Sequence, residues 1–246
     1  NIAIALESHG IYDLSQTLFK KAIAALEHLE HPDPTPWLAP AAILVSYGSF
    51  LADRNRLPEA KELFSRVDYS RPDVAPFALE RYIRYAGTIK DSELAERLLR
   101  KICEHPKTVL RFIGSGMREA LSAGVAPTTV LSLLTEVDKK YAGDREWAWT
   151  VADLYACLLI ADEKKEVVSE AAFLERVTTA WQHKVDGIDY RVIANLMLRL
   201  ADLRPGLACN IVIAMEEAGE SPPTDGLILL SQTPGMLDDL RFRALI

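Results

Sequence analysis

The stretch Leu44–Pro72, LVSYGSFLADRNRLPEAKELFSRVDYSRP, predicts two amphipathic helices joined by a tight turn. The following segment, Leu79–Pro106, repeats this layout, and Ala95 follows Ala60 by 35 residues in a matching context, ELAERLL after PEAKELF. Helix pairs that recur at a fixed period of this length are the sequence signature of a solenoid. The sequence therefore predicts an all-α fold, a right-handed α–α superhelix of antiparallel helix pairs.

The composition is typical of a globular chain and argues against nucleic-acid binding as its main function. Apolar residues make up 49% of the 246 residues and charged residues 26%, with a net charge of −7. An acidic balance argues against a protein whose main work is to hold phosphate backbones, although a local basic strip could still do so. No apolar run approaches the roughly 20 residues of a membrane-spanning helix, so we expect no membrane insertion.

The cysteines and the first residues bear on the cellular setting. Cys103, Cys157 and Cys209 lie 54 and 52 residues apart, which matches no metal-ligand spacing and no disulfide framework. We expect buried, reduced thiols in an intracellular protein, cytoplasmic or nuclear, with an organellar location left open. The chain opens directly on helical sequence, IAIALES, without a basic and then apolar leader. We therefore expect it to be a piece of a longer protein.

Apolar spacing and turn residues divide the chain into parts of one continuous solenoid. The predicted parts are a truncated first repeat over 1–31, two well-defined helix pairs over 41–106, degenerate helix pairs over 107–219 and irregular C-terminal helices over 220–246. A proline-rich connector, PDPTPWLAP, follows the first part. The individual helices are predicted over 2–8, 12–31, 41–53, 58–67, 76–86, 92–104, 108–123, 127–141, 146–161, 167–183, 190–203 and 206–218, with Ser92 as an N-cap.

Four residues of the central helix pair have a diagnostic spacing: Gly48, Ala60, Phe64 and Pro72. They resemble the small, alanine, aromatic and proline positions of the tetratricopeptide repeat. The resemblance extends over about 10–106, through Gly10, Tyr12, Phe19 and Ala22 in the preceding unit, and weakens beyond. It implies a module that binds a segment of another protein in a concave groove lined by the first helix of each pair, as a scaffold, adaptor or sensor arm.

Two related repeats remain as alternatives, and both act on RNA. The pentatricopeptide repeat has a 35-residue period, which the series Ala60, Ala95 and Val130 matches, and it reads single-stranded RNA one base per repeat. The half-TPR repeat of RNA-processing scaffolds tolerates a helix of the type AKELF. The acidic balance of the chain argues against an RNA-reading groove, so RNA binding is the second hypothesis.

The tetratricopeptide resemblance implies which side chains face the groove. These positions are Val45, Ser46, Ser49, Asp53, Phe77, Glu80, Arg81, Arg84, Arg111, Ser115 and Arg118. Arginine holds carboxylates and phosphates through a bidentate fork, so four arginines predict an acidic segment or phosphopeptide as the ligand. Alternatively, the arginines are solvated and paired with Glu62, Glu80 or Glu119.

A carboxylate clamp for chaperone C-terminal tails is a known variant of such grooves. Its lysine, asparagine and arginine positions correspond here to Ile4, Ser46, Phe77 and Arg81, of which only Arg81 matches. A chaperone tail is therefore not the expected ligand.

The sequence offers little to catalysis, cofactors or metals. It has no nucleophile elbow, no HExxH and no convincing pair of acids, so we expect no enzyme, no cofactor and no metal site. His28 and His31 are only two imidazoles and suit a helix C-terminus. Gly114 and Gly116 lack the lysine of a phosphate loop and are better suited to close helix contact. Other features have simpler roles too: of Trp147 and Trp149, one could be exposed at a contact surface, although core packing is the favoured interpretation.

Overall fold

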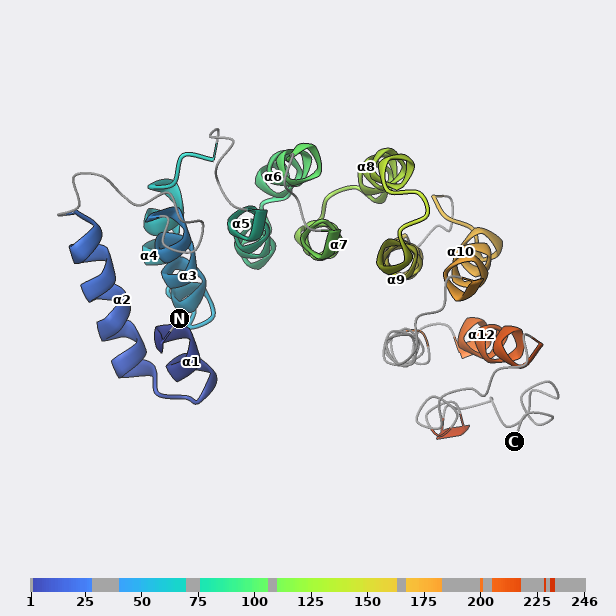
Figure 1. The fold of residues 1–246 in the computed structure, drawn as a ribbon, viewed down its shortest axis with the longest axis horizontal. Coiled ribbons are helices and arrows are strands. Elements are labelled where there is room, and N and C mark those ends of the chain that lie inside the picture. The colour runs from blue at the N-terminus through green and yellow to red at the C-terminus, as the bar shows by residue number, and fades with distance from the viewer. Residues whose placement is uncertain are drawn as a thin grey trace. The chain divides into compact units, whose positions relative to one another are not determined.

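The computed structural model describes residues 2–27, 40–69, 76–105, 110–162, 167–182, 200, 205–217, 228 and 231–232 (Figure 1). Every regular element within these ranges is an α-helix, which confirms the all-α prediction. The chain divides into two compact units, Asn1–Ala126 and Pro127–Ile246, which are described separately below as unit 1 and unit 2. The predicted helices over 190–203 and 220–246 lie almost entirely outside the described residues.

Unit 1 consists of consecutive helices joined by short connections. They are α1 (Ile2–Ser8), α2 (Tyr12–Glu27), α3 (Pro40–Ala52), α4 (Leu57–Ser65), α5 (Pro76–Thr88), α6 (Ser92–Glu104) and α7 (Leu110–Ala123). Helix α1 packs against α2, α2 against α3, α3 against α4, α5 against α6 and α6 against α7. In addition, α3 packs against α5 and α5 against α7. Helix α5 is therefore in direct contact with both α3 and α7.

The turns between paired helices share one geometry. Gly10, Asn55, Lys90 and Gly124 have a positive φ of 76°, 58°, 56° and 93°, and each follows the end of a helix. In each turn the next residue donates its N–H to the carbonyl five residues earlier, at 2.9 Å from Arg56 to Leu51 and from Asp91 to Ala86. This is the Schellman arrangement, which satisfies carbonyls left open at a helix end. Asn55 and Lys90 lie 35 residues apart, so the turn repeats with the period of the sequence.

One predicted cap is wrong by a single residue. The side chain of Asp91, and not that of Ser92, accepts a hydrogen bond from the Leu94 N–H at 2.9 Å and caps α6. The left-handed conformation of Lys90 ends the preceding turn immediately before Asp91, which places the Asp91 carboxylate over the first turn of the helix.

Replacing Lys90 with glycine is expected to raise the free energy of unfolding by about 0.5–1 kcal/mol. A lysine in the left-handed region is strained by about 1–2 kcal/mol, and glycine gives back only part of this in unfolded-state entropy. The exposed hydrogen bond from Lys90 Nζ to the Ser122 carbonyl, 2.9 Å long, would be lost at small cost. Urea denaturation followed by circular dichroism measures the change. Asn55→Gly is the matched control and should gain less, because asparagine tolerates this conformation; an equal gain at both positions would contradict the argument.

The core of unit 1 packs a small residue, Gly48, against a large aromatic ring, Phe64. Ala60 and Phe64 are fully buried, and a methyl group added at Gly48 would lie 3.1 Å from Cε2 of Phe64. The Phe64 ring stacks on Tyr82 with centroids 4.7 Å apart and contacts Tyr85 at 4.8 Å. This cluster joins α4 to α5.

Tyr69 completes the aromatic cluster at an energetic cost. Its ring centroid lies 4.7 Å from that of Tyr82, and its buried hydroxyl has no hydrogen-bond partner in the described structure. Burial raises the pKa of the Tyr69 phenol far above its usual value, and the neighbouring Tyr82 adds to this effect. The hydroxyl is therefore desolvated without compensation.

Replacing Tyr69 with phenylalanine is expected to leave stability unchanged or to raise it by up to about 1 kcal/mol at pH 7, because it removes an unpaired buried hydroxyl. Above pH 10 the unfolded chain ionises while the folded phenol keeps its proton, so the folded state binds more protons and wild-type stability falls as pH rises. Tyr69→Phe should flatten this fall. Urea denaturation between pH 8 and 11 measures both effects; a loss of more than 1 kcal/mol at pH 7 would contradict an unpaired hydroxyl.

The described helices of unit 2 are α8 (Pro127–Lys140), α9 (Arg145–Ala161), α10 (Glu170–Gln182) and α12 (Pro205–Glu217). Helix α9 packs against α8 and α10, and α10 packs against α12. Helix α10 begins three residues later than predicted, because the Ser169 hydroxyl caps it by accepting from the Ala172 N–H at 3.1 Å.

The tryptophans of α9 serve the core of unit 2. Trp147 and Trp149 are both buried, which favours the core-packing alternative over an exposed contact residue. They can point in different directions and still be buried because α8 and α10 both cover α9. Among the cysteines only Cys209 is fully buried; Cys103 and Cys157 are half-buried, which corrects the expectation for those two. No disulfide joins the three thiols.

Candidate partner-binding surface

Helices α5 and α7 lie side by side and run in the same direction. The Ser115 hydroxyl donates to Oε1 of Glu80 at 2.7 Å. Further along the two helices, a methyl group added at Gly116 would lie 3.3 Å from Cδ1 of Ile83, and one added at Gly87 would lie 3.5 Å from the Glu119 carbonyl. The contacts advance together along both helices, so equivalent positions of the two helices are aligned about 35 residues apart in sequence.

This alignment brings two stripes of predicted groove residues together. Each stripe has the spacing i, i+4, i+7, which places its members on one face of a helix. The stripes are Phe77, Arg81 and Arg84 on α5 and Arg111, Ser115 and Arg118 on α7. Arg84 and Arg111 are exposed and the other four are half-buried. We call these six residues the arginine surface.

The predicted groove positions on α3 do not join this surface as expected. Val45 is fully buried and Ser49 is only 7% exposed, so the expectation that they face a groove is wrong. Helix α3 packs against α2, α4 and α5, and these neighbours cover most of its circumference. Ser46 is half-buried, and Asp53, one residue beyond the end of α3, is exposed.

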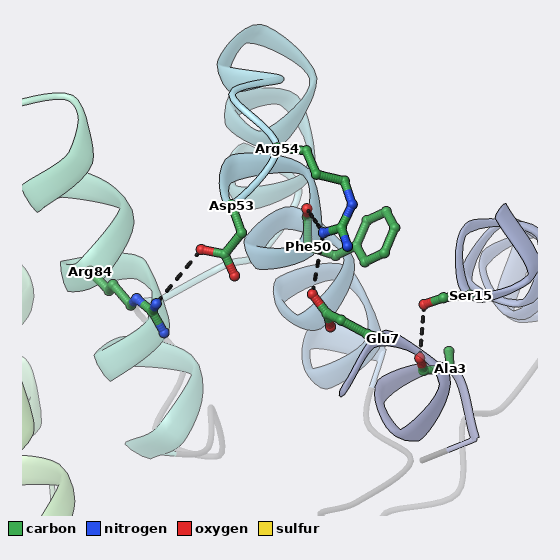
Figure 2. A network of polar contacts seen from close by, with 7 residues as sticks. All are labelled: Ala3, Glu7, Ser15, Phe50, Asp53, Arg54 and Arg84. Atoms are coloured by element: carbon green, nitrogen blue, oxygen red, sulfur yellow. Dashed lines mark hydrogen bonds and ion pairs between the residues drawn. The ribbon is translucent and has the colours of Figure 1, made fainter. Parts of the chain in front are cut away.

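Carboxylates are interleaved with the arginines. Arg84 Nη2 lies 3.7 Å from Oδ1 of Asp53, in an exposed ion pair (Figure 2). Burial raises the pKa of the half-buried Glu119 carboxyl; Arg84 and Arg118 oppose this effect, and Glu80 adds to it. The alternative of paired arginines thus holds for Arg84, whose ion-pair partner is Asp53 and which also interacts electrostatically with Glu119, one of the predicted glutamates.

Two arginines of the surface differ from Arg84 in their surroundings. The Arg111 guanidinium lies over the ring of its neighbour Phe112, 4.8 Å from the centroid. Arg81 makes no ion pair and no hydrogen bond with any other described residue. Within the described structure, Arg81 and Arg111 are therefore the side chains of this surface best placed to bind a carboxylate of a ligand.

Arg54 positions the turn that carries Asp53, a role that sequence reasoning missed. Its guanidinium donates to Oε1 of Glu7 at 3.3 Å and to the Phe50 carbonyl at 2.9 Å (Figure 2). It also lies over the rings of Phe50 and Tyr12, at 3.7 and 4.0 Å from their centroids. These contacts tie α1 and α2 to the end of α3. The only sequence feature that indicates this role is that Arg54 directly follows Asp53, a predicted groove residue.

Features that could support chemistry are few in the described residues. No group of three or more His, Cys, Asp or Glu in these ranges could hold a metal ion. Gly114 and Gly116 are buried inside α7, which favours the interpretation of close helix contact. His28 and His31 lie outside the described residues.

Unit 2 contains a small pocket of about 160 Å³ between α8, α9 and α10. Its charged groups are engaged with each other: Asp138 accepts from Trp147 Nε1 at 3.1 Å and pairs with Arg176 at 3.0 Å. Asp144 caps α9 by accepting from the Trp147 N–H at 2.9 Å. The polar groups of this pocket thus hold the three helices together.

Comparison with family models, with curated protein sequences and with solved structures found no match. None of the described helices has the length and apolar character needed to cross a membrane. The class that the described structure defines is an all-α protein built of successive, mutually packed helices.

Proposed function

We propose that this chain is a protein-binding module without catalytic activity of its own, a tetratricopeptide-like α–α superhelix that holds a segment of a partner protein. It would act inside the cell as a scaffold, an adaptor or the sensor arm of a larger protein. The pairing of Gly48 with Phe64, the repeated turn geometry and the contacts between first helices support a repeat of this kind.

The observation that carries the proposal is the alignment of the two stripes of the arginine surface. Phe77, Arg81 and Arg84 on α5 lie beside Arg111, Ser115 and Arg118 on α7 because the Glu80–Ser115 hydrogen bond fixes the register. An aromatic ring, four guanidinium groups and a hydroxyl on adjacent parallel helices form a surface suited to an extended peptide.

The chemistry of this surface favours an acidic ligand. Arg84 is paired with Asp53, whereas Arg81 and Arg111 can donate bidentate hydrogen bonds to ligand carboxylates. Asp53, Glu80 and Glu119 would repel a ligand that carries negative charge along its whole length. We therefore propose a segment with a few separated acidic residues, and not a polyanion.

The test uses peptides selected from a random display library against the immobilised chain. Acidic residues should be enriched among the selected peptides. Their affinity for Arg81→Glu/Arg111→Glu should fall on the order of 100-fold or more, because each of the two lost charge-assisted contacts contributes about 1.5–3 kcal/mol. Arg97→Glu, an equally drastic change at an exposed position of α6, is the matched control and should change affinity less than about twofold. Peptides without acidic enrichment, or equal losses in both variants, would refute the arginine surface.

RNA binding is the second candidate, and one observation favours it. The spacing of 35 residues recurs in the turns at Asn55 and Lys90 and in the Glu80–Ser115 contact, as in the pentatricopeptide repeat. Fluorescence anisotropy with a single-stranded RNA of mixed sequence tests it. RNA affinity that falls steeply with salt and is lost in Arg81→Glu/Arg111→Glu would replace the peptide proposal with this one.

A further inference from the structure

Arg81 and Arg111, the two arginines of the arginine surface best placed to bind a ligand, lie on adjacent parallel helices. Arg81 is on α5, and Arg111 is on α7 with its guanidinium 4.8 Å from the centroid of the Phe112 ring. The hydrogen bond from Ser115 to Glu80, 2.7 Å long, marks a level at which the two helices are aligned. Arg81 comes one residue after this level and Arg111 four residues before it. The two arginines are therefore offset along the helices by about 7.5 Å, at 1.5 Å per residue.

This offset determines how far apart the acidic residues of a ligand must be. The axes of packed helices are about 8–10 Å apart, so the backbone positions of Arg81 and Arg111 are separated by about 12 Å. Two residues of an extended chain advance by about 6.6 Å, and their side chains lie on the same face of the chain. Acidic residues at positions i and i+4 of an extended ligand thus lie about 13 Å apart on one face. A spacing of three or five residues would turn one carboxylate away from the surface.

The Glu80 carboxylate lies near the middle of the span between the two arginines. Its hydrogen bond with Ser115 joins α5 to α7 about 2 Å, measured along the helices, from the halfway level. Position i+2 of the ligand faces the surface at this point, because it lies on the same face as i and i+4. A carboxylate can accept several hydrogen bonds, and Ser115 supplies one. A donor side chain is therefore favoured at i+2, whereas Asp or Glu would be repelled by Glu80.

The other two arginines of the surface already interact with carboxylates of the chain itself. Arg84 forms the ion pair with Asp53, and both Arg84 and Arg118 interact electrostatically with Glu119. A ligand carboxylate would have to compete with these groups for Arg84 or Arg118. The pair formed by Arg81 and Arg111 therefore sets the spacing of the ligand.

We propose that the ligand of the arginine surface is an extended segment with acidic residues at positions i and i+4 and a hydrogen-bond donor, not an acidic residue, at i+2. One acidic side chain binds Arg81 and the other binds Arg111, while the i+2 side chain donates to Glu80. This inference rests on the proposed function, because it presupposes that the arginine surface binds acidic peptides. It adds the sequence pattern by which such a peptide is recognised.

Synthetic peptides of identical composition test the spacing. Each carries two glutamates in a background of glycine, serine and threonine, with the glutamates at i and i+3, at i and i+4, or at i and i+5. Fluorescence anisotropy with the full chain measures the dissociation constants. The i, i+4 peptide should bind about tenfold or more tighter than the other two, because it alone contacts both arginines.

A mutant cycle tests whether each glutamate contacts one particular arginine. When one glutamate of the i, i+4 peptide is replaced with glutamine, one of the variants Arg81→Gln and Arg111→Gln should no longer weaken binding, and the other should still do so. Replacing the other glutamate should give the opposite result. A general attraction between opposite charges would instead leave both variants equally sensitive to both changes.

The i+2 position is tested with Glu80→Gln, whose amide oxygen can still accept the hydrogen bond from Ser115. Changing serine to glutamate at i+2 of the i, i+4 peptide should weaken its binding to the wild-type chain about two- to fivefold. Glu80→Gln should remove most of this loss. Glu62→Gln, the same change at an exposed position of α4, is the matched control and should leave the loss as it is.

The possible failures of this inference and of the proposed function can be told apart. Equal affinities for the three spacings, together with weaker binding in both Arg81→Gln and Arg111→Gln, would overturn the spacing and leave peptide binding by the arginine surface intact. A loss at i+2 that persists in Glu80→Gln would overturn the contact with Glu80. Peptides that bind both arginine variants as tightly as the wild-type chain, or that do not bind at all, would refute the arginine surface itself.

Discussion

Replacing Phe64 with alanine is expected to lower the free energy of unfolding of unit 1 by about 3–5 kcal/mol. The Phe64 ring is fully buried, stacks in parallel on Tyr82 and lies against Gly48 on α3. Its removal opens a cavity between α3, α4 and α5 that backbone atoms on the Gly48 side cannot fill. The loss therefore combines the transfer of a phenyl ring to water with the cost of an unfilled void.

Urea denaturation followed by far-UV circular dichroism measures this loss. Phe64→Leu is the control, and it should lose less than the alanine variant because leucine fills most of the space without stacking on Tyr82. Any Phe64 variant that remains folded should bind the peptide ligand of the arginine surface with unchanged affinity. A loss below 1 kcal/mol for Phe64→Ala would show that Phe64 is not the residue joining the three helices.

Replacing Trp147 with alanine is expected to destabilise unit 2 by a similar amount, about 3–5 kcal/mol. Trp147 is 1% exposed, and its indole N–H donates to Asp138 on α8 at 3.1 Å. The change removes the largest fully buried side chain of the described residues. It also removes one hydrogen bond to the Asp138 carboxylate, which would then be left with its ion pair to Arg176.

Intrinsic tryptophan fluorescence reports this loss, because Trp149 and Trp181 remain in unit 2. Trp147→Phe separates the two contributions: it keeps most of the packing and removes only the hydrogen bond, so a loss of about 1–2 kcal/mol is expected. If the phenylalanine and alanine variants were equally stable, the hydrogen bond to Asp138 would account for the whole effect and the packing argument would fail.

The helices themselves could be predicted from the sequence because their cause is local. Apolar residues recur at helical spacing, and proline, glycine and aspartate mark the ends, so most predicted limits fall within three residues of the described ones. Spacing alone drew attention to Gly48, Ala60 and Phe64; the structure buries all three and places the Phe64 ring beside Gly48. The superhelix that these elements would build stays a prediction.

Burial on α3 and the left-handed turns could not be predicted, because their causes are tertiary. Ser49 is polar and suited to a groove, but it is buried since three helices surround α3. At positions 55 and 90 no glycine indicates a left-handed backbone conformation, because the residues there are Asn and Lys. The left-handed conformation of Lys90 is tolerated because two helix ends must meet there.

The stripes of the arginine surface followed from helical spacing, whereas their electrostatic partners did not. The sequence places Arg81 and Arg84 on one face of a helix. It does not show that Asp53, in the turn after α3, forms an ion pair with Arg84 on α5. Nor does it show that Arg54 holds that turn through Glu7 and Phe50. Long side chains choose among several partners within reach, and only the fold decides between them.

The shared turn geometry makes unit 1 a series of locally closed loops, and this has a consequence for how the unit opens. Each hydrogen bond that closes a turn spans only five residues, so its closure involves no distant segment of the chain. The amides of Ile11, Arg56, Asp91 and Val125 donate these four bonds. The hydrogen-exchange rate of each of these amides would therefore report the local opening of its own turn. Exchange rates that change progressively from one turn to the next would mean that unit 1 opens stepwise from one end.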